Sequence, residues 1–102
     1  MIQINGTITL APGTIADNPE TVEAIKTMVA ASRAEEGCLT YTFAQDLSDP
    51  DSLVIYERWE SQEALAAHGQ SAHMAEFQKV MAANPPVGRD LRVYQTDEGN
   101  PL

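Results

Sequence analysis

The apolar residues of this 102-residue chain switch between two periodicities, and the order of the switches is its most restrictive feature. Near the start, Ile2, Ile4 and Ile8 share one parity while polar residues fill the other, which predicts a strand with one apolar face. The expected strands span residues 2–10, 39–44, 53–59 and 91–94, and the expected helices span 19–36 and 62–83. The order βαββαβ in so short a chain predicts an α+β, ferredoxin-like sandwich with both helices on one face of the sheet.

Capping residues mark the ends of both expected helices. The pair Asn18-Pro19 is typical of a helix start, and Gly37 predicts the end of that helix. Ser61 is suited to cap the second helix, and Pro85 stops it. A weak point falls inside the second helix at residues 69–71, where Gly69 and Ser71 disfavour helical structure.

One face of the predicted sheet has apolar side chains that the helices do not cover. The strand over 53–59 is apolar on both faces at its start, and Val54, Tyr56 and Tyr94 fall on the face away from the helices. Because a monomer seldom leaves such a face in water, we expect a homodimer.

Composition narrows the partners and the compartment. Six Lys and Arg against 15 Asp and Glu give a net charge of -9, which disfavours nucleic acid and anionic membrane surfaces as partners. The start lacks the pattern of a signal peptide, and no apolar run approaches the roughly 20 residues of a membrane span. With a single cysteine, Cys38, the expected location is cytoplasmic. Residues 1–96 are expected to form one domain and residues 97–102 a polar C-terminal tail.

Several short motifs in fixed order resemble the antibiotic biosynthesis monooxygenase (ABM) domain family, in particular its quinol-monooxygenase-like branch. They are Glu36-Gly37-Cys38, Glu57-Arg58-Trp59-Glu60-Ser61, and the segments that contain His68 and His73. The resemblance covers the chain from Met1 to about Gln95. It implies a homodimer in which two sheets form an α+β barrel, with a pocket in each subunit between sheet and helices.

Other branches of the family fit the chain less well. Haem-degrading members place a Trp near the position of His68 and their haem-binding His near Gln78, although Asn5 resembles their Asn. Anthrone oxygenases share Trp59, but their Asn and Tyr correspond to Ile55 and Leu65. The second-helix histidine resembles that of quinol-oxidising and signal-processing members.

His68 and Glu57 are the candidate catalytic residues. His68 lies three residues after Leu65 on the apolar stripe of its helix, so it should point inward, where an imidazole can accept a phenolic proton. Glu57 shares its parity with apolar residues of its strand, and burial would raise its pKa toward values useful for proton transfer. The alternatives are a structural core histidine and a structural carboxylate that accepts hydrogen bonds from Arg33, Arg92 or a helix end.

Aromatic and polar side chains are expected to complete a substrate pocket. The predicted substrate-binding residues are Trp59, Asn5, Tyr41, Phe43, Phe77 and His73. His73 has an alternative role at the helix restart near Ser71, and Trp59 has the alternative of a core residue. In an unbroken helix His68 and His73 would lie roughly 140° apart, so no metal site is expected, and Cys38 is expected to be inert.

The expected function is therefore that of a cofactor-independent monooxygenase. Its substrate would be a small aromatic, quinol or anthrone-like molecule that reacts with O2 after deprotonation in an apolar pocket. Two alternatives stay open: a non-oxidative isomerase or lyase acting on a small carbonyl compound, and a non-catalytic dimeric ligand-binding module.

Overall fold

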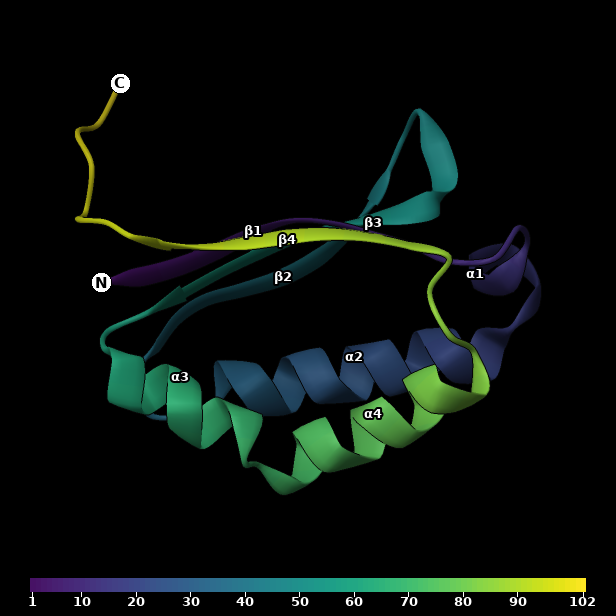
Figure 1. The fold of residues 1–102 in the computed structure, drawn as a ribbon, viewed down its shortest axis with the longest axis horizontal. Coiled ribbons are helices and arrows are strands. Elements are labelled where there is room, and N and C mark those ends of the chain that lie inside the picture. The colour runs from purple at the N-terminus through teal and green to yellow at the C-terminus, as the bar shows by residue number, and fades with distance from the viewer.

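The computed structural model describes residues 1–102, and it contains a four-stranded antiparallel sheet with its three longer helices on one face (Figure 1). The sheet order is β2-β3-β1-β4, which is the ferredoxin-like arrangement predicted from the sequence. The elements are β1 (Ile2–Thr9), α1 (Thr14–Asp17), α2 (Pro19–Arg33), β2 (Cys38–Asp46), β3 (Asp49–Trp59), α3 (Gln62–Gly69), α4 (Ala72–Ala83) and β4 (Gly88–Gln95).

Alternation along the strands separates an inner face, covered by helices, from an outer face. In β3, Ile55 and Glu57 are buried, whereas Val54 and Tyr56 between them are exposed. The strand pairing aligns Glu57 with both Ile4 and Tyr41 across its two neighbours, so these side chains share the inner face. Sheet register therefore brings the candidate carboxylate and Tyr41 next to each other.

The outer face of the sheet has exposed apolar residues, as the alternation predicted. Val54, Tyr56 and Tyr94 are between 38% and 44% exposed. Leu39, which shares parity with Tyr41 in the sequence, is 45% exposed, because a register irregularity between Cys38 and Thr40 shifts the strand there.

The starts of α2 and α3 follow the capping signals, whereas the end of α2 does not. The Asn18 side chain accepts a hydrogen bond from the backbone N–H of Thr21, and Ser61 accepts one from Ala64. The first helix ends at Arg33 rather than just before Gly37, which leaves Glu35 in the loop that follows. The short helix α1 was not predicted.

The second predicted helix is two helices, and the division falls at the weak point of the sequence. α3 ends at Gly69, and Ser71 caps α4 by accepting a hydrogen bond from the backbone N–H of Met74. The Ser71 hydroxyl also donates to the carbonyl of His68 at 2.7 Å. The break between α3 and α4 changes the direction of the chain between His68 and His73.

The core lies between α2 and the inner face of the sheet. It contains Leu10, Met28, Tyr41, Ile55 and Trp59 together with a few neighbouring aliphatic residues. No helix has both the length and the apolar character needed to cross a membrane.

Gly37 holds a conformation that other residues rarely adopt, just before β2. Its φ is +83°, and a Cβ atom would come within 2.6 Å of the Ala64 Cβ. We expect Gly37→Ala to lower the free energy of unfolding by roughly 1–3 kcal/mol, measured by urea denaturation. Gly69→Ala is the matched control, because a Cβ there meets nothing within 4 Å, and it should be neutral or slightly stabilising. Equal losses in the two variants would contradict this account of Gly37.

Candidate functional site

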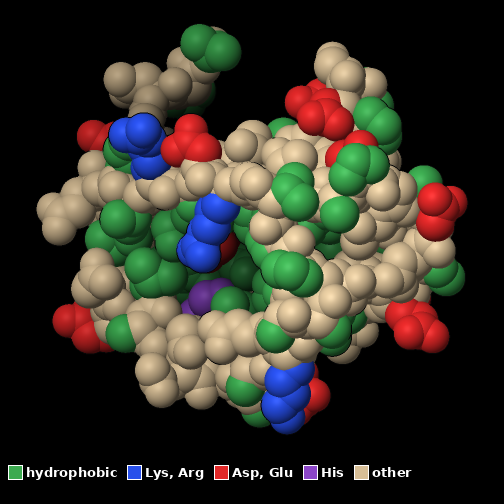
Figure 2. All heavy atoms as spheres, turned by 45° about the vertical axis from the view of Figure 1, so that its right-hand side comes forward, with side chains coloured by type: hydrophobic (Ala, Val, Ile, Leu, Met, Phe, Trp, Pro, Cys, Tyr) green, Lys and Arg blue, Asp and Glu red, His purple; other side chains and the backbone are tan.

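A cavity of about 490 Å³ lies between the inner face of the sheet and helices α3 and α4. Figure 2 shows the hollow from its open side, with apolar walls and a histidine at its base. Most of its lining is apolar, and His68, Glu57 and Tyr41 supply polar atoms. The lining also includes Phe43 and Phe77, whose rings meet edge to face at 5.9 Å. Five predicted site residues therefore border one cavity.

Arginine side chains also border the cavity. Figure 2 shows a basic side chain at the opening, and the lining includes Arg89 and Arg92 of β4. Arg92 donates to the Asp90 carboxylate at 3.4 Å, whereas no acidic side chain pairs with Arg89. Arg89 is therefore available to an anionic group of a bound molecule.

His68 lies in the last turn of α3 and is almost fully buried. Its Nδ1 is 2.6 Å from Oε2 of Glu35, and its Nε2 is 3.3 Å from the hydroxyl of Tyr41. Because a carboxylate can only accept, a neutral imidazole here has its proton on Nδ1 and its lone pair on Nε2. The rings of Trp59 and Tyr41 pack against the imidazole at centroid distances of 4.7 and 5.1 Å. His68 thus presents a fixed proton-accepting nitrogen beside the cavity.

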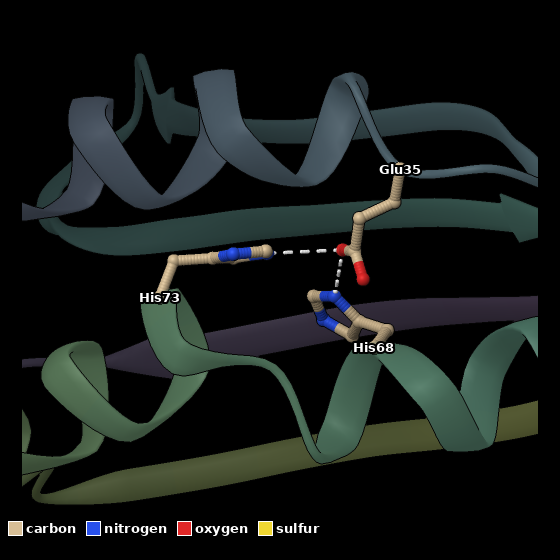
Figure 3. A group of neighbouring side chains, drawn as sticks. All are labelled: Glu35, His68 and His73. Carbon is tan, nitrogen blue, oxygen red and sulfur yellow. Dashed lines mark hydrogen bonds and ion pairs between the residues drawn. The ribbon is translucent and has the colours of Figure 1, made fainter.

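Glu35 is the functional candidate that the sequence did not reveal. It lies in the loop after α2, and its side chain is 17% exposed. Figure 3 shows it meeting both histidines, which come from the end of α3 and the start of α4. Only the early end of α2 places the carboxylate here, and no motif around Glu35 signals that position.

His73 lies elsewhere than predicted. It does not line the main cavity; instead it borders a second cavity of about 260 Å³ between α2 and α4. Its Nε2 is 3.0 Å from the same Glu35 oxygen that His68 contacts. An unbroken helix would have turned the two histidines to different sides, but the helix is broken between them, and both contact Glu35. His73 also does not cap α4, since Ser71 does so.

Glu57 is a buried carboxyl group on the floor of the cavity. The indole N–H of Trp59 donates to its Oε1 at 3.0 Å, and neither Arg33 nor Arg92 bonds to it. Burial raises the pKa of Glu57, and the Trp59 hydrogen bond and nearby His68 offset part of that rise. This is the direction expected for a carboxyl group on the inner face of the strand.

Two predicted substrate-binding residues lie away from the cavity. Trp59 is fully buried and supports Glu57 and His68 from behind, so it is not a wall for a substrate. Asn5 does not line the cavity either, because it falls on the opposite parity from Ile4, and it accepts a hydrogen bond from Gln3. Strand parity alone explains the position of Asn5.

Tyr41 remains a neutral hydroxyl at ordinary pH. Burial, and secondarily the charge of Glu57, raise its pKa. Its O–H can therefore donate to Nε2 of His68 whenever no other donor replaces it.

Comparison with known proteins matches residues 1–80 to the family model described as antibiotic biosynthesis monooxygenase. That range includes β1 to β3, His68, Glu57 and most of α4. The chain belongs to this family.

The relatives of this chain are distant in sequence. An uncharacterised Synechocystis protein, sll1783, is 27% identical over 77 residues, which is 76% of this chain and 52% of that protein. YcnE of Bacillus subtilis, provisionally assigned as a monooxygenase, is 31% identical over 52 residues, which is 51% of this chain and 55% of YcnE. The chain thus spans about half the length of the curated relatives it matches.

Solved structures show the same ABM fold over the whole chain. A Deinococcus radiodurans protein, provisionally assigned as an antibiotic biosynthesis monooxygenase, has a TM-score of 0.85 at 22% identity and covers 100% of this chain and 98% of its own. PA3566 of Pseudomonas aeruginosa has a TM-score of 0.77 at 28% identity, covering 97% and 94%. A likeness at 22% identity supports the fold and leaves the substrate open.

The raised pKa of Glu57 makes stability depend on pH in a definite direction. The folded protein keeps this proton at pH values where the unfolded chain has lost it, so the stability from Glu57 is present at low pH and is lost as pH rises through the folded-state pKa. Glu57→Gln removes the titration but retains an oxygen that can accept from Trp59. We expect the melting temperature of Glu57→Gln, relative to wild type, to rise between about pH 4 and about pH 7.

The matched control is Glu98→Gln, because Glu98 is exposed in the C-terminal segment. Its melting temperature relative to wild type should not change over the same range. A flat difference for Glu57→Gln as well would show that burial does not perturb this carboxyl group.

Proposed function

We propose that this ABM-family protein is a cofactor-independent monooxygenase that acts on a small aromatic, quinol or anthrone-like substrate. The observation that carries the proposal is the position of His68, which lines a mainly apolar cavity while its Nδ1 lies 2.6 Å from the Glu35 carboxylate. This is the arrangement of a general base oriented by a carboxylate. The family match supports a monooxygenase-like activity in general terms.

The proposed chemistry needs no reductant besides the substrate. His68 removes a hydroxyl proton from the quinol, and the resulting anion gives electrons to O2. A carbon–oxygen bond then forms, and the O–O bond breaks. One oxygen atom remains in the oxidised product, and the other leaves as water with two hydrogens from the substrate. The protein supplies the base, the apolar pocket and exclusion of bulk water.

The cavity suits a ring system with a polar group at each end. Phe43, Phe77 and Leu65 offer apolar contacts to a ring. His68 and Glu57 supply polar groups at one part of the lining, and Arg89 of β4 supplies another. A substrate hydroxyl would replace the Tyr41 hydroxyl as the donor to His68 Nε2, since that contact is a long 3.3 Å. Glu57, whose pKa is raised, can share the proton. Arg89 favours substrates with an anionic substituent.

Oxygen uptake over a panel of hydroquinones and anthrones tests the chemistry. We expect His68→Ala to lower the rate by about 10² to 10⁴, the usual contribution of a general base. Glu35→Gln should lower it less, because the amide can still accept from Nδ1–H but loses the charge. His73→Ala should have a much smaller effect, because His73 does not line the cavity.

Controls separate the proposed reaction from its alternatives. The assays are run with chelator present, and circular dichroism verifies that each variant is folded. An anaerobic incubation tests turnover without oxygen. Anaerobic conversion of a carbonyl substrate with no oxygen uptake would favour an isomerase or lyase, and full activity in His68→Ala would show that His68 is not the base.

We further propose that the protein is a homodimer that pairs through the outer face of the sheet. Val54, Tyr56 and Tyr94 are exposed apolar residues on this face, opposite the helices. The sheet-to-sheet pairing implied by the ABM resemblance would cover it. Burial of the patch would also stiffen the sheet that forms the floor of the cavity.

A charge in this surface should dissociate the dimer. We expect Val54→Asp to shift the mass found by light scattering from that of two chains to that of one at micromolar concentration, because a carboxylate would be buried without a partner. Val87→Asp is the control, since Val87 is exposed in the loop before β4 and outside this face. A monomeric wild type would rule out the pairing.

A further inference from the structure

Two nitrogen donors and one carboxylate oxygen from separate parts of the chain converge beside the main cavity. They belong to Glu35, His68 and His73, and their nearest ligand atoms all lie within 4.8 Å of one another. Figure 3 shows both imidazoles directed at one carboxylate. Two histidines and one carboxylate with a free coordination position are a recurrent ligand set for zinc and iron in proteins.

We propose that Glu35, His68 and His73 form a site for one divalent transition-metal ion of the zinc class. This inference concerns a site distinct from the proposed proton acceptor, His68 Nε2, and does not depend on the oxidation chemistry. The metal binds Nδ1 of His68, Nε2 of His73 and a Glu35 oxygen.

The distances are close to those required. Ligand atoms at about 2.1 Å from a tetrahedral ion lie roughly 3.4 Å apart. Here the Glu35 oxygen is 2.6 Å from His68 Nδ1 and 3.0 Å from His73 Nε2, each now bridged by a proton. All three ligand atoms lie within 4.8 Å of one another, so an ion would require the Glu35 oxygen to move away from both nitrogens and the nitrogens to adjust around it. The break between α3 and α4 has already brought the two imidazoles to one point.

The surroundings supply an outer partner and a route of entry. Histidine ligands usually donate their other ring N–H to an acceptor, and the Tyr41 hydroxyl oxygen is 3.3 Å from His68 Nε2. The His73 and Glu35 side chains are 22% and 17% exposed, so an ion can reach them from the side of the second cavity. The net charge of -9 attracts cations.

Metal binding and the proposed base function exclude each other. A neutral imidazole bound to metal through Nδ1 has its proton on Nε2, which then donates to Tyr41 and cannot accept a proton from a substrate. The same three residues would therefore switch His68 from acceptor to donor when metal binds. Zinc should act as an inhibitor of the proposed oxidation.

Calorimetric titration of chelator-treated, dialysed protein with Zn²⁺ alone tests the site. We expect one Zn²⁺ per chain in wild type and an affinity lower by more than about 100-fold in His73→Ala and in Glu35→Gln, beyond the loss typical of an outer partner. Glu36→Gln is the matched control, because this exposed carboxylate adjoins Glu35 and should leave binding unchanged. Visible absorption of the Co²⁺ form reports whether nitrogen ligands bind the ion.

Separate outcomes decide the two proposals. Absence of stoichiometric binding in wild type, or equal binding in folded His73→Ala, would falsify the metal site and leave the oxidation intact. Inhibition of oxygen uptake by Zn²⁺ in wild type but not in His73→Ala would support the switch. Stimulation of uptake by Fe²⁺ in wild type alone would support the site but overturn the mutual exclusion and the cofactor-independent reaction.

Discussion

The hydrogen bond between His68 Nδ1 and Glu35 is the interaction on which the candidate site depends. It fixes the position of the proton on the imidazole and joins the loop after α2 to the end of α3. The contact from His73 to the same oxygen adds the start of α4. Three elements that build the helical layer thus meet at one carboxylate oxygen. A partly buried carboxylate is tolerated there because two N–H donors replace part of its water.

The break between α3 and α4 is the local feature that makes this convergence possible. Gly69 and Ser71 disfavour a continuous helix, and Ser71 satisfies backbone groups on both sides of the break. In a continuous helix the five-residue spacing would turn the two imidazoles away from each other. The break between α3 and α4 therefore determines that both histidines can act on the same carboxylate.

The sequence predicted the layers of this fold better than its contacts. Strand alternation was sufficient to place Glu57, Tyr41 and Phe43 on the inner face, and helical spacing was sufficient to turn His68 inward, because both depend only on local periodicity. Asn5 was assigned to the pocket by family resemblance and Trp59 by its flat ring at the end of a strand, but strand parity places Asn5 elsewhere and complete burial makes Trp59 a core residue. Glu35 escaped notice because its role depends on where α2 ends and on two residues over 30 positions away. No pattern within one segment records such a contact.

The two nitrogens of the His68 ring have different surroundings. Nε2 borders an apolar cavity beside Tyr41, and Nδ1 borders a polar cluster that solvent can reach through His73. Whatever occupies the Nδ1 side determines the proton on the cavity side, because a neutral imidazole holds one proton between two nitrogens. A carboxylate alone leaves Nε2 as an acceptor, and a cation makes it a donor. The reactivity of the cavity is therefore governed by residues that do not line it, and relatives that keep the histidine but vary the loop after α2 or the helix break need not share its chemistry.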